Sequence, residues 1–337
     1  MVGPPDGAVT IEPQGARRKE GDKVSDPRSV FARYAGTLAV ALLVSGLAPA
    51  PSEAAKTIAA AGDIACDPAS RYFNYGRGWG GYCRQQATSR LLAGADRVLP
   101  LGDLQYEHGT LRRIRASYDR SWGNYFSITR PAIGNHEFGT ADDKYIDRAE
   151  GYYDYWGSRA GPRGKGYYSY NLGDWHMVVL NSVCWSVGGC HRGSAQERWL
   201  RADLARNRGR RCTLAYYHHP NFTSGQSGTK FRRTLKPFWD ALMDARAEAV
   251  LYGHDHVYER FAPQTSSGSP NRFGPRAFMV GTGGKNHGRF PYRRANSVVR
   301  LREHGVLRMR LDSGRFEWRF ASPFTSRSLD QGSARCQ

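Results

Sequence analysis

Short apolar runs, most of them followed at once by a small residue and then a polar one, constrain the fold more than any other feature of this chain. They alternate with helical stretches and Gly-rich loops, and no fixed-period repeat is present. This alternation predicts an α/β domain. The candidate strands are residues 57–61, 97–101, 129–133, 212–217, 249–252 and 277–281.

Two further pairs of runs predict β-hairpins, and hairpins make the expected sheets mixed and not purely parallel. The paired runs are residues 166–172 with 175–181, and residues 305–311 with 315–320. Helix signals are clearest from Ser194, where Ser194 and Glu197 form a capping-box pattern, and over residues 230–245.

The first 50 residues predict an export signal behind a long polar leader. Basic residues precede an apolar segment, residues 37–47, that is shorter than the roughly 20 residues a membrane-spanning helix needs. Small residues of the A-x-A type follow it, so we expect cleavage near Ala50. The alternative is a short membrane anchor. Residues 51–337 are then one catalytic domain, secreted or associated with the cell wall.

Six cysteines indicate an oxidising compartment, and none of their spacings makes a C-x-x-C zinc pattern. We therefore interpret all six as structural. Proximity along the chain favours two short pairs and leaves one long one. The expected pairs are Cys66 with Cys83, Cys184 with Cys190, and Cys212 with Cys336.

The chain has 337 residues and a formal charge of +19, while 40% hydrophobic content is enough to bury one large core. A basic protein attracts polyanions such as phosphate esters, nucleic acid and anionic cell-wall polymers. The alternative is that the charge serves solubility alone. Because the arginines are spread along the chain, a dedicated nucleic-acid surface is not indicated.

Polar blocks at the predicted strand ends carry the chemistry. Each block alone is more often a turn or a core residue, but five in this order predict a metal site. Ligands at the ends of adjacent strands converge on one crevice, and glycines let the backbone approach an ion closely. The blocks are Gly62-Asp63, Gly102-Asp103-Leu104-Gln105-Tyr106, Gly134-Asn135-His136-Glu137, His218-His219-Pro220 and Gly253-His254-Asp255-His256.

The donors divide into two kinds. Carboxylate and phenolate oxygens suit a trivalent ion, whereas imidazole nitrogen and amide oxygen suit a divalent one. Two cations about 3.5 to 4 Å apart need a shared carboxylate between them. Asp103 is the natural bridge.

These blocks resemble the metallophosphoesterase superfamily and its purple acid phosphatase branch, whose pattern is GD, GDxxY, GNH, a histidine before x-Pro, and GHxH. The resemblance spans residues 57–260, and Gly281-Thr282-Gly283-Gly284 is similar to the family's closing loop. It implies a four-layer α/β sandwich of two mixed sheets flanked by helices. The chain departs from the pattern at Ala65 and Ala215, and neither departure changes a ligand.

The resemblance also implies two metal ions, Fe3+ plus a divalent Zn2+, Fe2+ or Mn2+. Tyr106 implies the iron, because a tyrosinate bound to ferric iron gives the purple enzymes their colour. Asp103 would bridge the two ions. The first ion would be held by Asp63, Tyr106 and His256, and the second by Asn135, His218 and His254.

Further roles follow from the same resemblance. His136 is expected to be the general acid. His218 is preferred over His219 as a ligand because the family spacing is His-x-Pro. Substrate contacts are expected from Asn135, His136 and His219.

Residues beside these blocks leave alternatives open. The acidic side chains Glu137, Asp255 and Glu259 are either partners that orient imidazoles or polar residues satisfied beside the site. Residues 71–82 are either a rim that chooses substrates or an ordinary disulfide-closed loop.

The function expected from these residues is hydrolysis of phosphate monoesters, with a metal-bound hydroxide as nucleophile. One alternative is a phosphodiesterase acting on nucleotides or phospholipid headgroups. A non-enzymatic alternative is a secreted polyanion-binding protein. The motifs do not separate monoesters from diesters, because the loops that shape the substrate pocket carry no readable signal.

Overall fold

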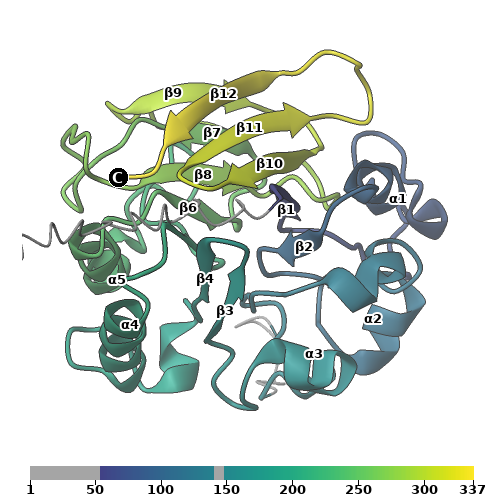
Figure 1. Ribbon diagram of the computed structural model, residues 1–337. Coiled ribbons are helices and arrows are strands. Elements are labelled where there is room, and N and C mark those ends of the chain that lie inside the picture. The colour runs from purple at the N-terminus through teal and green to yellow at the C-terminus, as the bar shows by residue number, and fades with distance from the viewer. Residues whose placement is uncertain (1–53, 140–147) are drawn as a thin grey trace, which may run out of the picture. The chain divides into compact units, whose positions relative to one another are not determined.

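A computed structural model describes residues 54–139 and 148–337 and contains two β-sheets with flanking helices (Figure 1). The helices are α1 Gln85–Ser89, α2 Leu111–Ala116, α3 Glu150–Trp156, α4 Ala195–Arg206 and α5 Arg232–Asp244. The strands are β1 Lys56–Ala61, β2 Arg97–Pro100, β3 Tyr168–Leu172, β4 Trp175–Val179, β5 Cys212–Tyr216, β6 Ala249–Tyr252, β7 Tyr258–Phe261, β8 Arg276–Val280, β9 Ser297–Leu301, β10 Val306–Asp312, β11 Arg315–Ala321 and β12 Asp330–Arg335.

Both sheets are mixed, as the sequence predicts. The five-stranded sheet has the order β12-β11-β10-β1-β2, and the seven-stranded sheet has the order β3-β4-β5-β6-β8-β7-β9. β1 and β2 are parallel, and so are the neighbours β4, β5, β6 and β8. Parallel neighbours bring their carboxyl ends to one edge of each sheet, where the polar blocks follow.

Alternation along the central strands builds two cores. On β5, Leu214 and Tyr216 belong to the core that also holds β1 and β10 residues, whereas Ala215 packs with residues of α4 and α5. Successive side chains of a strand point to opposite faces, so one apolar strand serves both layers. Figure 1 shows α4 and α5 together on one side and α1 to α3 on the other.

Residues 129–133 differ from the prediction. The segment makes only isolated bridges, Thr129 with Val98 and Ala132 with Leu101, and is no regular strand. Pro131 lies between them and has no N–H to extend the ladder. The segment still runs beside β2 and delivers the block that follows it.

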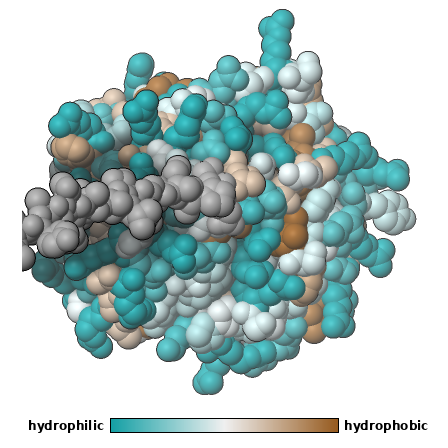
Figure 2. All heavy atoms as spheres, viewed as in Figure 1, coloured by the Kyte–Doolittle hydropathy of each residue, from teal (hydrophilic) through white to brown (hydrophobic). Residues whose placement is uncertain are grey.

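Three strands were missing from the prediction: β7, β9 and β12. β7 starts two residues after His256, and β12 is polar at most positions, so neither shows an apolar run. β9 has no buried position. β7 pairs with β8, β12 pairs with β11, and β9 pairs with β7. β10 and β11 expose Arg310 and Arg319 to solvent. Hydrophilic residues cover most of the face of the molecule seen in Figure 2.

The disulfide and helix predictions are confirmed. The bonds are Cys66–Cys83, Cys184–Cys190 and Cys212–Cys336. Ser194 caps α4 by accepting from the Glu197 N–H at 3.3 Å. No helix among the described residues is long and apolar enough to cross a membrane. The predicted export signal and its cleavage near Ala50 lie outside the described residues.

Candidate metal centre

The polar blocks of both sheets meet at one place. Asp63 and Asp103 follow β1 and β2 of the five-stranded sheet, while His218 and His254 follow β5 and β6 of the seven-stranded sheet. The His254 N–H donates to Asp63 Oδ2 at 2.8 Å, and His218 Nδ1 donates to the Leu101 carbonyl at 2.9 Å. The two sheets are therefore joined through the predicted ligands themselves.

One cluster gathers Asp63, Tyr106 and His256, the residues predicted for the first ion. The Tyr106 hydroxyl lies 2.7 Å from Asp63 Oδ1 and 3.0 Å from His256 Nε2. It also lies 3.0 Å from Asp103 Oδ2. All four side chains present their donor atoms to a common point.

A second cluster gathers Asn135, His218 and His254, the residues predicted for the second ion. Asn135 Oδ1 lies 3.2 Å from His218 Nε2 and 3.1 Å from His254 Nδ1. His218 Nε2 also lies 3.1 Å from Asp103 Oδ2. The same oxygen of Asp103 thus contacts both clusters.

Protein contacts decide which nitrogen each imidazole shows to the site. His218 Nδ1 is used by the Leu101 carbonyl, and His256 Nδ1 lies 2.7 Å from the side-chain oxygen of Asn286. An imidazole that donates from one nitrogen keeps a lone pair on the other. In both residues the nitrogen left for the site is Nε2, which faces the clusters and is suited to bind a metal once it has lost its proton.

Backbone strain is concentrated here. Asp63, Asp103 and His254 have φ angles of 60°, 49° and 81°, a region that side chains other than glycine rarely adopt. Strained residues persist where the surroundings hold them, and they cluster at functional sites. At Gly134 an added Cβ would lie 2.2 Å from Asp103 Oδ1, so glycine is required for the close approach.

The buried charges favour a cation. Burial opposes ionisation of Asp103, but His218 and His136 outweigh it and hold the pKa of Asp103 well below its usual range. Burial likewise lowers the pKa of His218, yet the Asp103 carboxylate raises it to about 9. Burial and then His218 lower the pKa of His254 to about 3, which leaves a neutral imidazole with a free lone pair.

Burial and the neighbouring carboxylates keep the Tyr106 phenol neutral. Burial, and then the carboxylates of Asp103 and Asp63, raise the pKa of Tyr106 well above its usual value. Only a strong positive charge at the phenol oxygen would ionise it. Two buried carboxylates, a phenol, an amide oxygen and three imidazoles form a donor set that fits a pair of unlike metal ions.

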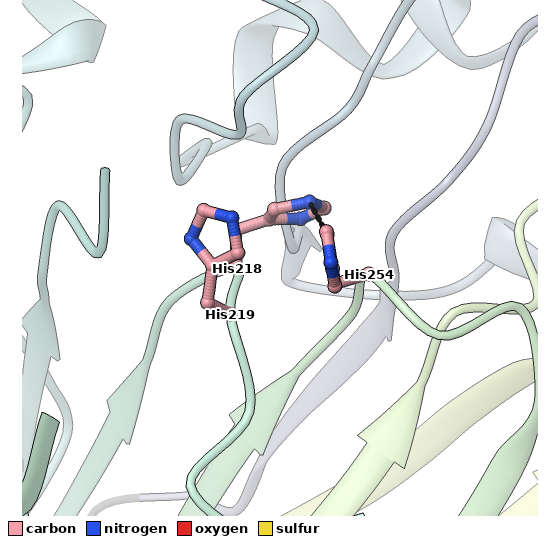
Figure 3. Close-up of side chains that lie close together, drawn as sticks. All are labelled: His218, His219 and His254. Carbon is pink, nitrogen blue, oxygen red and sulfur yellow. Dashed lines mark hydrogen bonds between the residues drawn. The ribbon is translucent and has the colours of Figure 1, made fainter. Parts of the chain in front are cut away.

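His136 and His219 lie beside the clusters. His136 Nδ1 donates to the Glu107 carbonyl at 2.6 Å, while its Nε2 lies 3.8 Å from Asp103 Oδ2. His219 Nδ1 donates to the Ser182 carbonyl at 3.1 Å. Figure 3 shows His219 beside His218 and His254, and the ring centroids of His219 and His254 are 4.6 Å apart.

The acidic neighbours accept from backbone N–H groups and hydroxyls, so these carboxylates fix the loops beside the site. The Glu137 carboxylate accepts from the N–H groups of Gly134 at 2.7 Å, Asp103 at 3.0 Å and Leu104 at 2.8 Å. Burial, with the Asp103 charge, raises the pKa of Glu137 to about 8. The other two, Asp255 and Glu259, accept from residues 223–227.

Sequence reasoning missed three contributors. Asn286 orients His256, Ser182 orients His219, and the Lys285 ammonium lies 4.4 Å from the centroid of the Tyr106 ring. Asn286 and Lys285 directly follow the glycine-rich segment 281–284, which was the available signal. Ser182 follows β4 by a few residues and had no pattern to mark it.

Comparison with known proteins places the chain in a family. The calcineurin-like phosphoesterase model matches residues 56–258. Probable purple acid phosphatase 20 of Arabidopsis thaliana is 27% identical over 66% of this chain and 54% of its own length. Purple acid phosphatase 21 of the same plant is 31% identical over 45% of this chain and 36% of its own length. The chain thus spans about half, or less, of these relatives.

Solved structures share the fold. Purple acid phosphatase PPD1 from yellow lupin seeds superposes with a TM-score of 0.66 at 17% identity, over 85% of this chain and 55% of that one. A dimetal phosphatase from Danio rerio superposes with a TM-score of 0.56 at 14% identity, over 85% of this chain and 100% of that one. With the family match, the two mixed sheets and the converging motifs, this chain belongs to the calcineurin-like phosphoesterase family and has purple acid phosphatases among its relatives.

Proposed function

We propose that this protein hydrolyses phosphate monoesters at a dinuclear metal centre. The observation that carries the proposal is the contact of one Asp103 oxygen with both donor clusters. Two-metal hydrolysis needs such a shared carboxylate. Family membership agrees with phosphoester hydrolysis, and the resemblance to purple acid phosphatases favours monoesters.

The proposed ions are Fe3+ and a divalent Zn2+, Fe2+ or Mn2+. The oxygen-rich cluster around Tyr106 suits the trivalent ion, and the cluster of Asn135 with two imidazoles suits the divalent one. When bound, the ions neutralise the phosphoryl oxygens and lower the pKa of the attacking water. The proposed ligands are Asp63, Tyr106 and His256 for the first ion, Asn135, His218 and His254 for the second, and Asp103 as the bridge.

The remaining roles belong to histidines at the edge of the site. His136 is fixed through Nδ1 by the Glu107 carbonyl, so its Nε2 is free to hold a proton and pass it to the leaving oxygen. His219 is fixed through Nδ1 by Ser182 and keeps Nε2 for a phosphoryl oxygen. The Asn135 side chain would share that contact with the substrate.

A mutation of the bridge tests the proposal. Asp103→Asn keeps the size of the side chain but removes the charge that two cations share. Because loss of a residue behind the ligands already costs 10- to 100-fold in such sites, we expect the rate of aryl phosphomonoester hydrolysis to fall by more than about 100-fold. Metal content, measured by mass spectrometry, should fall in parallel.

The matched control is Asp312→Asn, an ion-paired carboxylate at the end of β10 that should change neither rate nor metal content. Unchanged hydrolysis in Asp103→Asn would exclude the dinuclear mechanism. Faster turnover of an aryl phosphodiester than of the monoester would replace the monoester function by the phosphodiesterase alternative. Tight binding of phosphate without any turnover would instead support the polyanion-binding alternative.

We further propose that the protein acts outside the cell or in the cell wall. Three disulfides agree with an oxidising compartment. The net charge of +19 favours encounter with anionic substrates and polymers.

A further inference from the structure

Trp185 is an exposed aromatic side chain on a rigid loop. It lies in the short 3₁₀ helix Cys184–Val187, and 62% of its surface is exposed. The disulfide Cys184–Cys190 closes this loop, and the Ser186 hydroxyl donates to the Val183 carbonyl at 2.8 Å. A ring that a closed loop already holds in place loses little conformational entropy when it binds a ligand.

One ring contact and the position of the loop in the sequence place this ring next to the candidate centre. The rings of Trp185 and Phe138 meet edge to face with centroids 5.0 Å apart. Phe138 is buried and lies in the turn that carries Asn135 and His136, where its N–H donates to the Asn135 carbonyl at 3.1 Å. On the other side, Ser182, which fixes His219, is three residues before Trp185.

Other exposed aromatic residues are engaged differently. Trp79 and Tyr82, in the loop at residues 71–82, pack on the ring of Tyr72 with centroids 5.2 Å and 4.4 Å away. These rings form a cluster of their own. Trp185 instead packs on the buried ring of Phe138, which continues into the turn of His136, and most of the Trp185 surface is exposed to solvent.

We infer that Trp185, supported by Phe138, is a stacking platform for a planar aromatic ring on the alcohol side of the substrate. The inference rests on the proposed function and narrows its substrate class to phosphomonoesters with an aryl group or a nucleobase near the phosphate. Stacking of a base on an aromatic side chain is sequence-tolerant because every planar ring has a π-face. A ring stacked on Trp185 would lie on the side of the site where Phe138 joins the turn that carries His136.

The test compares two substrates in matched variants. Metal-loaded wild-type protein is assayed with 2-naphthyl phosphate and with glycerol phosphate, which lacks a ring. In Trp185→Ala we expect kcat/KM for 2-naphthyl phosphate to fall about tenfold, within the range of measured stacking losses, mainly through KM. The value for glycerol phosphate should change less than about twofold, and Trp185→Phe should restore most of the loss.

The control is Phe273→Ala, an aromatic side chain with 45% exposure that lies in the β7–β8 loop, at the end of β8 away from the site. Phe273→Ala should leave kcat/KM unchanged for both substrates. Inhibition by 2-naphthylphosphonate, compared with inhibition by inorganic phosphate, reports binding of the ring without turnover. The advantage of the naphthyl compound should be lost in Trp185→Ala and kept in Phe273→Ala.

Two outcomes overturn the inference in distinguishable ways. If Trp185→Ala changes kcat/KM equally for both substrates, or for neither, Trp185 has no stacking role. The proposed phosphatase function is then unaffected. Failure of the metal-loaded wild type to hydrolyse either substrate removes the proposed function and this inference with it.

Discussion

Several imidazoles at the candidate centre use one nitrogen for a contact with the surrounding protein and keep the other for the crevice. Leu101 and Asn286 perform this selection for His218 and His256. Ser182 performs it for His219. Because such partners set the orientation and basicity of the ring, they matter almost as much as the ligands.

Tyr106 gives a prediction at this scale. If its oxygen binds ferric iron as the resemblance to purple acid phosphatases implies, the wild-type protein absorbs visible light and Tyr106→Phe loses that band. The ring itself should stay in place, because it is buried and packs against His136 with centroids 4.2 Å apart. The absorption spectrum of iron-loaded protein checks this.

Tyr118→Phe is the control, since Tyr118 is another buried phenol outside both clusters. Its spectrum should match that of the wild type. A visible band of full strength in Tyr106→Phe would show that the phenol is no ligand.

At the scale of elements, α4 stabilises the loop that borders the site. Its first turn places Gln196, which accepts from the Asn181 N–H at 2.7 Å and donates to the Asn181 carbonyl at 2.8 Å. Asn181 begins the loop that carries Ser182 and Trp185. Helix capping by Ser194 is thus connected to the position of the loop that carries Ser182 and Trp185.

Ser194→Ala removes the cap of α4. The free energy of unfolding should fall by about 1 kcal/mol, the usual loss when a capping hydroxyl is deleted. Urea unfolding followed by circular dichroism measures this. Ser333→Ala, on an exposed position of β12, should change stability by less than about 0.5 kcal/mol. An equal loss in both variants would mean that the cap contributes nothing.

At the scale of the molecule, the two sheets are held together at opposite ends by different means. The site joins β1 and β6 through the bond from the His254 N–H to Asp63. At the other end, the Cys212–Cys336 disulfide ties the chain end to β5, where Glu248 accepts from the N–H groups of Thr213 at 2.5 Å and Gln337 at 3.1 Å.

Burial raises the pKa of Glu248 from 4.5 to about 7. Above pH 4.5 the unfolded chain loses this proton while the folded chain keeps it, so the stabilisation is full below pH 4.5 and is lost as pH rises to about 7. Glu248→Gln cannot ionise. We therefore expect its free energy of unfolding, relative to wild type, to rise by about 2 kcal/mol between about pH 5 and about pH 8.

Urea unfolding at the two pH values measures this difference. Glu317→Gln removes a carboxylate that is 41% exposed and should show no such slope. Glu248→Gln also weakens the hydrogen bond from the Gln337 N–H, but this effect is the same at both pH values and leaves the slope unchanged. A relative stability of Glu248→Gln that is independent of pH would refute the raised pKa.

Much of this protein was determined by local sequence. Apolar runs with polar ends predicted β1, β2, β5 and β6 and the residues behind them, because backbone periodicity and the carboxyl ends of parallel strands act over few residues. Hairpins, the α4 cap and the short disulfides follow from neighbours along the chain. The prediction was weakest where Pro131 interrupts a ladder and where strands without an apolar run, such as β7 and β12, are placed by contacts with distant residues, such as that of Arg260 with Asp330.

Only the tertiary structure decided what depends on distant residues. It brings Asp103 into contact with both clusters, assigns the free nitrogen of His218 and His256, and sets Trp185 against Phe138. Each of these is a contact between side chains whose partner is chosen by packing and not by spacing in the sequence. Residue types determined which chemistry is possible here, and the packing of two sheets against each other decided which atoms perform it.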